Sequence, residues 1–283
     1  MRIKNFDEEK HILYLVATPI GNLAEMSPRA IEILNSVDAI GCEDTRVSRQ
    51  LLNNFNIVKK LISCHEHNEE QASNELLKYL ENGNVAYISD AGYPGISDPG
   101  HRLLTRALDN NYKVSVVSGA SAMLNALIGS GLDTTHFYFH GFLASKHSTR
   151  IRELEELKNK KETLIFYESP HRIHETLTDL RDVFGNRKAT IARELTKRFE
   201  EYIREDLNTL CEIDISTLKG EMVLIIEGNT IEKSISETDL LNYANDLISS
   251  GVNTKTAAKL TANHFKVSKN DVYELLIKVK ENE

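Results

Sequence analysis

The sequence is poor in cysteine and has no long apolar run, and both absences narrow the class of protein. Its three cysteines, Cys42, Cys64 and Cys211, include no CxxC pair, so neither a zinc ribbon nor a thioredoxin-like dithiol is indicated. Isolated thiols in odd number are typical of reduced cysteines in the cytosol. No apolar stretch reaches the roughly 18 residues of a membrane span, and Met1 to His11 lacks the apolar segment of a signal peptide. We therefore expect a cytoplasmic protein that does not enter a membrane.

An excess of basic residues is also absent. The 283 residues carry 34 Lys and Arg against 42 Asp and Glu, a net charge of −8 that repels phosphate at long range and excludes a histone-like binder. Apolar residues make up 41% and charged residues 27%, which excludes a mainly disordered chain and a collagen. The length predicts roughly two domains.

Apolar runs alternate with segments of helical periodicity along most of the chain. The runs predict strands at 12–17, 39–42, 61–64, 85–89, 114–117, 137–140, 163–167, 189–192 and 222–227. The periodic segments predict helices at 28–36, from 47, and at 69–80, 102–108, 120–128 and 173–184. This alternation favours an α/β protein with a substantially parallel sheet, which we divide into domains of residues 1–117 and 118–230.

The third segment, residues 231–283, has a different pattern. Two capping boxes, 236–239 and 268–271, and a possible cap at 253–254 predict three short helices that resemble a helix-turn-helix unit. Between Lys255 and Lys280 six lysines stand against two acids, a local charge of +4 inside an acidic protein. The pattern fits an RNA-binding module, and it also fits the solvated face of a dimerisation or capping module.

A loop rich in glycine and proline, residues 90–100, joins a predicted strand to a predicted helix. Its glycines permit unusual dihedrals and let a ligand approach the main chain closely. Its two aspartates suit a cation or a ribose hydroxyl, and the GKS or GKT ending of a P-loop is absent. Small-residue turns at 18–23 and 118–122 also follow strands, so the three turns predict one shared ligand cleft.

Other polar segments are less specific. Glu43 to Arg46 follows a strand, where a helix cap with a surface ion pair is the alternative to a functional site. Cys64 to Glu69 contains possible metal ligands, but no second cluster has matching spacing, so zinc is disfavoured and no metal is expected. His171 and His174 fit a surface pair better than a metal site, and the absence of a G-x-S-x-G elbow disfavours a hydrolase.

As a set, these motifs resemble the tetrapyrrole-methylase superfamily and, within it, the ribosomal small-subunit RNA methyltransferase I family, which methylates a cytidine 2′-oxygen in 16S rRNA. The matching stretches are 18–23, 43–46, 65–69, 89–92, 96–100, 119–122, 130–132, 141–143, 167–172, 193–197 and 219–221. The resemblance implies two α/β domains with S-adenosylmethionine in the cleft between them, followed by a small helical domain. It also implies a homodimer that acts on a decoding-centre cytidine of 16S rRNA, within the 30S subunit.

The resemblance further implies which residues bind the cofactor. The loop from Gly92 to Asp98 would hold its methionine part, Ser121 and Ala122 would contact it from the second domain, and later turns would enclose its adenosine. The expected cofactor-binding residues are Pro19, Asp90, Gly92, Tyr93, Pro94, Ile96, Ser97, Asp98, Ser121, Ala122, Tyr167, Glu168, Ala192, Arg193, Glu194 and Gly220.

Methylation of a ribose hydroxyl is helped by a general base, and RNA binding needs cations on one face. Glu43 and His67 are the first candidates for the base, because the segments around them are distinctive of the rRNA-modifying members. The residues expected to contact RNA are Asp44, Arg46, Arg49, Asn68, Glu69, Lys146, Arg150, Arg172, Lys197, Lys255, Lys259 and Lys269.

Two other functions stay open at this point. A methyltransferase of tetrapyrroles or other small molecules would need neither the basic tail nor the segments 43–46 and 65–69. A non-catalytic RNA-binding or assembly protein could keep the fold with a degenerate pocket that binds no cofactor.

Overall fold

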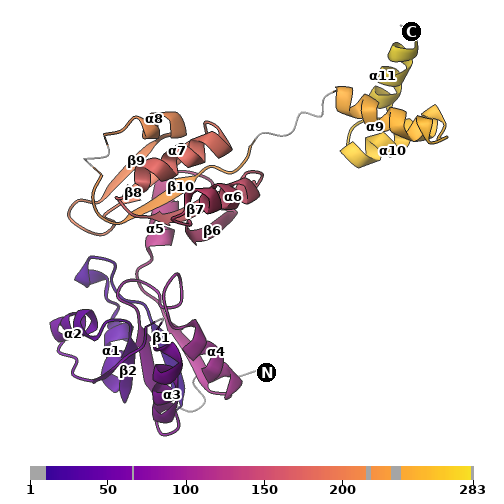
Figure 1. Ribbon diagram of the computed structural model, residues 1–283. Helices are drawn as coiled ribbons and strands as arrows, with labels where there is room; N and C mark the ends of the chain where they lie inside the picture. The colour runs from indigo at the N-terminus through magenta and orange to yellow at the C-terminus, as the bar shows by residue number, and fades with distance from the viewer. Residues whose placement is uncertain (1–10, 66, 215–217, 231–236, 282–283) are drawn as a thin grey trace. The chain divides into compact units, whose positions relative to one another are not determined.

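A computed structural model of the protein describes residues 11–65, 67–214, 218–230 and 237–281 (Figure 1). The chain divides into two compact units, one up to Asn229 and one from Thr230. Within the described ranges, the first unit contains two five-stranded sheets and the second contains three helices. The boundary between the two α/β domains at Ser118 stays a prediction.

The first sheet is parallel throughout, with the strand order β3-β2-β4-β1-β5. Its strands are β1 (Ile12–Val16), β2 (Ala39–Cys42), β3 (Lys60–Ser63), β4 (Val85–Ile88) and β5 (Lys113–Val117). Its helices are the 3-10 helix η1 (Leu23–Glu25), α1 (Pro28–Ser36), α2 (Thr45–Asn54), α3 (Glu69–Leu80) and α4 (His101–Asp109).

Successive side chains of β1 enter two different cores on opposite faces of this sheet. Ile12, Tyr14 and Val16 pack with residues of α1 and α2, whereas Leu13 and Leu15 pack with residues of α3 and α4. A parallel sheet that is buried on both faces needs apolar residues at consecutive positions. This is why its inner strands β1 and β4 are continuous, fully buried apolar runs in the sequence.

The second sheet is mixed, with the order β6-β7-β10-β8-β9. Only β6 and β7 pair in parallel, and the other three pairings are antiparallel. Its strands are β6 (Phe137–Phe142), β7 (Thr163–Glu168), β8 (Lys188–Arg193), β9 (Glu201–Asp206) and β10 (Met222–Ile226). Its helices are α5 (Ala122–Ser130), α6 (His147–Leu157), α7 (Ile173–Phe184) and α8 (Leu207–Cys211).

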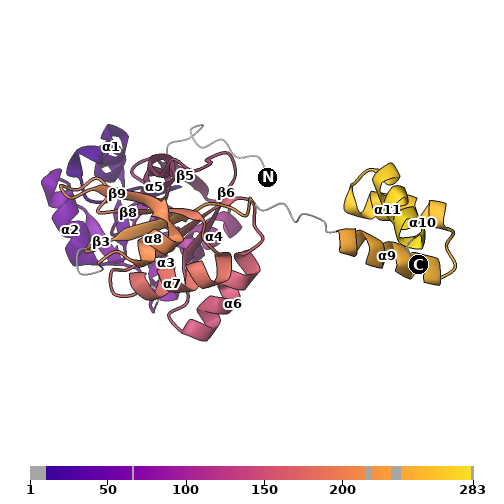
Figure 2. The ribbon, with the colours of Figure 1, turned by 90° about the horizontal axis from the view of Figure 1, so that it is seen from above.

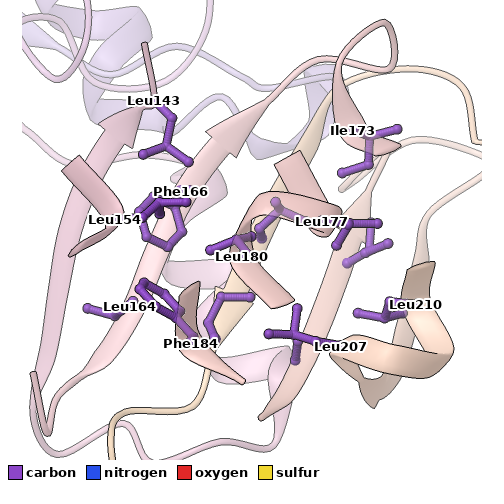
Figure 3. Close-up of a cluster of buried hydrophobic side chains, with 14 of the residues drawn as sticks. Leu143, Leu154, Leu164, Phe166, Ile173, Leu177, Leu180, Phe184, Leu207 and Leu210 are labelled. Atoms are coloured by element: carbon purple, nitrogen blue, oxygen red, sulfur yellow. The ribbon is translucent and has the colours of Figure 1, made fainter. Parts of the chain in front are cut away.

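Helices cover both faces of the second sheet. α6 and α7 lie side by side on one face together with α8 (Figure 2), and their leucines form one core with Leu164 and Phe166 of β7 (Figure 3). α5 covers the other face, where Ala126 and Leu127 pack against Ile165 and other strand residues.

The predicted α/β class is confirmed, and the parallel arrangement holds for the first sheet only. The strand β9 and the helices α6 and α8 were not predicted. β9 has the sequence EYIRED at the edge of the sheet, with no buried residue, so it has no apolar run that marks a strand. α6 begins in a polar, basic stretch, so its buried Leu154 and Leu157 were not recognised as the apolar side of a helix.

The C-terminal unit has a core of its own. Its helices are α9 (Glu237–Ser249), α10 (Thr254–Phe265) and α11 (Lys269–Glu281). Leu240, Ala244, Ala258 and Val272 join this core, and Asn253 caps α10 by accepting a hydrogen bond from the Thr256 N–H at 2.9 Å. The three predicted helices are therefore present. The expected cap at residue 236 lies outside the described residues. No helix in the described part of the chain is long and apolar enough to cross a membrane.

Candidate cofactor and substrate site

A cavity of about 540 Å³ lies in the first compact unit, where turns that follow strands of both sheets meet. Its size falls within the range of small-molecule sites, about 300–1,000 Å³. The lining residues are Ile20, Ala91, Gly92, Tyr93, Ile96, Ser97, Asp98, Ser121, Ala122, Phe142, Tyr167, Glu168, Ser169, Pro170, Glu194, Leu195, Lys197, Gly220, Glu221, Met222 and Val223.

Strand direction explains why residues from distant parts of the second domain meet here. β10 runs antiparallel to β7 and β8, so Met222 at its start pairs with Glu168 and Arg193 at the ends of those strands. Gly220 therefore lies at the same edge of the sheet as the segments that follow Glu168 and Arg193. Ligands of α/β proteins bind at such strand ends.

Hydrogen bonds hold the three small-residue turns together. Thr18 and Gly92 exchange two of them, at 2.9 and 3.1 Å, which join the turn after β1 to the loop after β4. The Gly119 N–H donates to the Tyr93 hydroxyl at 3.2 Å, which adds the turn after β5. Ile20, Gly92 and Ser121 all line the cavity, so the three turns share one cleft as predicted.

The rim from the second domain is built on unusual backbone and an ion-pair bridge. Glu194 has φ +49° and Gly220 has φ +85°, and the Gly220 Cα packs against the Glu194 side chain. Lys197 Nζ lies 3.0 Å from Glu194 Oε1 and 2.8 Å from Glu221 Oε2, and its aliphatic stem covers Gly21 of the first domain. Burial opposes ionisation of Glu194, but the bonds from Lys197 and the Glu221 N–H lower its pKa below the usual value. Strained backbone of this kind clusters at functional sites.

Three carboxyl groups of the first domain influence one another at the cavity. Asp98 lines the cavity, and burial followed by the Glu43 carboxylate raises the pKa of Asp98 to about 6. Burial and then the Asp90 carboxylate also raise the pKa of Glu43, and burial raises that of Asp90. Crowded carboxylates of this kind can attract a cation or accept a proton.

The structure brings eleven of the sixteen expected cofactor residues around this one cavity. Those that do not line it are Pro19, Asp90, Pro94, Ala192 and Arg193. Pro19 and Pro94 adjoin lining residues, Ala192 is buried in the core of the second sheet, and Arg193 Nε bonds to Glu201 Oε2 at 2.5 Å instead.

Ten of the residues that line the cavity were not among the expected cofactor-binding residues. They are Ile20, Ala91, Phe142, Ser169, Pro170, Leu195, Lys197, Glu221, Met222 and Val223. Most of them adjoin expected residues or lie within matched motifs, so neighbourhood in the sequence was a usable signal. Nothing in the sequence shows which residues at the start of β10 face the cavity.

Neither candidate base lines the cavity, but the two differ in their surroundings. Glu43 is half-buried, and its carboxylate helps to raise the pKa of Asp98, which lines the cavity. His67 is exposed, and its ring centroid lies 6.0 Å from that of His65. Within the described part of the chain, no group of three or more His, Cys, Asp or Glu could hold a metal ion.

One expected RNA contact is wrong. Arg150 is 1% exposed, its Nε bonds to Asp179 Oδ2 at 2.6 Å, and its Nη1 bonds to the Ser145 carbonyl at 3.2 Å. The basic stretch that carries Arg150 forms an amphipathic helix, and this arginine is on the buried side. It is a structural residue and does not face RNA.

Other expected RNA contacts brace loops. Asn68 accepts a hydrogen bond from the His65 N–H at 2.7 Å, and Glu69 Oε1 accepts from the N–H groups of Gly100 and Arg102 at 3.1 and 3.0 Å. Asp44 caps α2, where hydrogen bonds from Arg46 lower its pKa to about 2.

The cations divide into paired and exposed groups. Arg172 bonds to the buried Glu168 at 2.9 Å, and Lys197 forms the bridge described above. Arg46 is paired with Asp44, yet its side chain is 89% exposed. The other expected contacts are exposed, namely Arg49, Lys146, Lys255, Lys259 and Lys269.

Comparison with known proteins agrees with this geometry. The tetrapyrrole (corrin/porphyrin) methylase family model matches residues 12–211. A ribosomal RNA small subunit methyltransferase I from Halalkalibacterium halodurans is 43% identical over 95% of both chains, and that from Synechocystis is 44% identical over 95% of this chain and 98% of its own.

A crystal structure of diphthine synthase has the same fold, with a TM-score of 0.60 over 78% of this chain and 91% of its own. At 14% identity it bears on the fold alone. The family model covers more than two-thirds of the sequence and the relatives cover nearly all of it. The chain therefore belongs to the tetrapyrrole methylases and, among them, to the ribosomal RNA small subunit methyltransferase I family.

Proposed function

We propose that this protein methylates the ribose 2′-oxygen of a decoding-centre cytidine in 16S rRNA, within the 30S subunit, using S-adenosylmethionine. The observation that carries the proposal is the convergence of eleven expected cofactor residues on one cavity. The relatives that match almost the whole chain are named small-subunit rRNA methyltransferases, which favours rRNA over a tetrapyrrole as the substrate.

The cavity fits this cofactor in shape and charge. Gly92 has φ +77° and no side chain, and the space beside its Cα is open to at least 3.4 Å, so the main chain can approach a ligand there. Buried Met222 and Val223 offer an apolar wall for the adenine, and Asp98 offers a carboxylate for the positive charge. When bound, S-adenosylmethionine supplies a methyl group that its sulfonium charge has already activated.

Transfer to a hydroxyl releases a proton, and the carboxylates of the first domain can accept it. Glu43 is the first candidate, because it is half-buried and close enough to Asp98 to raise its pKa. A raised pKa brings Glu43 closer to the basicity that proton transfer at neutral pH requires. His67 is the second candidate.

Exposed cations on each unit support RNA binding. An acidic protein can bind RNA phosphates when its basic residues gather on one face. Arg46, Arg49 and Lys146 are exposed on the first unit, and Lys255 and Lys259 on the second. Arg172 and Lys197 would have to exchange a carboxylate partner for a phosphate. The C-terminal unit is then an RNA-binding module.

A homodimer in the cytoplasm completes the proposal. α5 exposes Leu124 and Ile128, which are 40% and 72% exposed and lie one helical turn apart on the same side. The edge strand β5 exposes Val116 at 51%. Apolar surface of this kind is commonly covered by a second copy. The free cysteines, two of them buried, fit a reducing compartment.

Mass mapping of 16S rRNA from cells that lack the gene tests the proposed reaction. We expect one ribose methyl near the decoding centre to disappear and to return when the wild-type gene is supplied. An unchanged map rejects the proposal. Assays with free 16S rRNA and with unmethylated 30S subunits then identify the substrate, and calorimetry with S-adenosylmethionine separates an enzyme from a protein that retains only the fold.

A further inference from the structure

A β-bulge in the edge strand β6 aims Phe142 at the cavity. β6 pairs with β7 in the register Phe139 with Ile165, Gly141 with Phe166 and Phe142 with Tyr167, so His140 is an extra residue. Gly141, with φ +85°, makes this possible, and a Cβ there would lie 3.1 Å from Ser97 Oγ in the loop after β4. A bulge is a common device for redirecting a side chain next to a functional site.

The side reached by Phe142 depends on this inserted residue. Phe139 packs with Ile165 on the face that α5 covers. Regular alternation would put Phe142 on the opposite face, which α6, α7 and α8 cover. The bulge returns Phe142 to the side of Tyr167, whose ring centroid lies 5.4 Å from its own in an edge-to-face contact. Leu143, the next residue, is buried in the opposite core (Figure 3).

Phe142 stands at the outer part of the cavity. It is 56% exposed although it lines the cavity, whereas Leu195, Met222 and Val223 are at most 6% exposed. The buried residues can enclose a cofactor, and the exposed ring leaves an aromatic face for something that arrives from solvent. Ile96, which belongs to the loop after β4, is also exposed and lines the same cavity.

Two cationic residues belong to, or contact, the loop that follows Phe142. Arg172 Nη1 donates to the carbonyl oxygen of Leu143 at 3.3 Å, which places the guanidinium next to the residue that follows Phe142. Lys146 is exposed and precedes α6, four residues after Phe142. An exposed aromatic face with cations at the adjoining loop matches one nucleotide, whose base stacks and whose phosphates are negative.

We propose that Phe142 is the platform on which the base of the methylated nucleotide stacks while its ribose enters the cavity. The inference rests on the proposed function. A nucleotide reaches a concave site by leaving its stack in the folded RNA, and an aromatic side chain replaces the stacking that is lost. Phe142 is thus a substrate-binding residue, distinct from the buried residues that hold the cofactor.

Substitutions at Phe142 test this role in the full-length protein with unmethylated 30S subunits. F142L keeps apolar bulk but removes the ring, and we expect kcat/KM for the subunit to fall roughly 5- to 100-fold, as loss of one base stack predicts. F142Y keeps the ring and should restore kcat/KM to within a few-fold of wild type. F137L is the matched control, because Phe137 is exposed on the same strand but does not line the cavity.

Binding measurements separate the substrate role from a structural or cofactor role. Calorimetry with S-adenosylhomocysteine should give the same affinity for wild type and F142L, and the unfolding midpoints should agree. A pyrrolocytidine placed at the methylated position should be quenched by wild type and not by F142L. If F142L loses cofactor affinity as much as it loses kcat/KM, or if its kcat/KM is unchanged, the role of Phe142 is rejected and the proposed function is not. A wild-type protein that methylates no RNA rejects the proposed function itself.

Discussion

Arg150 and Asp179 form a buried ion pair that joins α6 to α7, with Nε donating to Oδ2 at 2.6 Å. The Arg150 side chain is 1% exposed and the Asp179 side chain 8%. The same guanidinium also binds the carbonyl of Ser145, so the pair anchors the loop that follows β6. That loop begins directly after Phe142, and its position depends on charges inside the second domain.

Replacement of Arg150 by alanine should destabilise the protein by about 3–5 kcal/mol, because the buried Asp179 would lose its arginine and be left with Nδ1 of the exposed His147, 3.2 Å from Oδ2. Denaturant unfolding followed by circular dichroism measures this change. The matched control is K146A, whose side chain is exposed at the N-terminal end of α6. K146A should unfold like wild type and lose affinity for 30S subunits. Wild-type stability in R150A would contradict the structural role.

Affinity for S-adenosylmethionine should fall as the pH decreases through about 6. The pKa of Asp98 is raised to about 6, first by burial and then by the Glu43 carboxylate. Above that pH the carboxylate attracts the sulfonium, and below it the neutral carboxyl group does not. Calorimetry across this range should show the loss in wild type and not in D98N. S-adenosylhomocysteine has no sulfonium charge and serves as the control ligand. An equal pH dependence in D98N would count against Asp98.

The first α/β domain was largely predictable because burial on both faces makes its strands visible as apolar runs. Ala39–Cys42 and Glu69–Leu80 were predicted with the bounds that the structure shows. β9 escaped prediction because an exposed edge strand does not need apolar residues. The side chain of Arg150 was misassigned because a lysine or arginine in a basic stretch gives no sign of a buried partner that lies 29 residues further along the chain.

The candidate site was predictable where small residues mark it. Ile20, Gly92 and Ser121 belong to turns that the sequence reveals, and all three line the cavity, whereas Gly220 was expected there only from the family resemblance. Phe142 was not assigned to the site, since its direction depends on a one-residue bulge. Alternation along a strand shows on which face of the sheet a side chain lies only when the register is regular. No pattern in the sequence therefore places the Phe142 ring at the cavity.

Loss of both candidate bases should slow the chemical step and leave cofactor binding nearly unchanged. We expect E43A to lower the single-turnover rate roughly 100-fold or more, which is the usual contribution of a general base, and H67A to have a smaller effect. Rapid-quench measurements at saturating cofactor and RNA isolate this step. A double variant that methylates at the wild-type rate would exclude both residues.

Glu69 should stabilise the loop of residues 90–100 through the first turn of α4. Its Oε1 accepts from the N–H groups of Gly100 and Arg102, and no side chain of α4 itself caps this end. E69A should therefore lower the free energy of unfolding by about 0.5–2 kcal/mol and weaken cofactor binding. E69Q retains an oxygen acceptor and should lose less of both. Unfolding curves measure the stability, and calorimetry measures cofactor binding. A loss of RNA affinity in E69A with unchanged stability and cofactor affinity would point to an RNA contact instead.

Removal of residues 230–283 should weaken RNA binding far more than cofactor binding. The first unit ends at Asn229 and contains every residue that lines the cavity, whereas the C-terminal unit has a separate core and exposed lysines at 255, 259 and 269. Cofactor affinity of the truncated protein should match the full chain in calorimetry. Binding of 30S subunits should weaken and depend less steeply on salt, because fewer phosphate contacts release fewer counterions. The triple variant K255A/K259A/K269A should reproduce the reduced salt dependence in a full-length chain. Equal RNA affinity after truncation would show that the C-terminal unit serves another purpose, such as dimerisation.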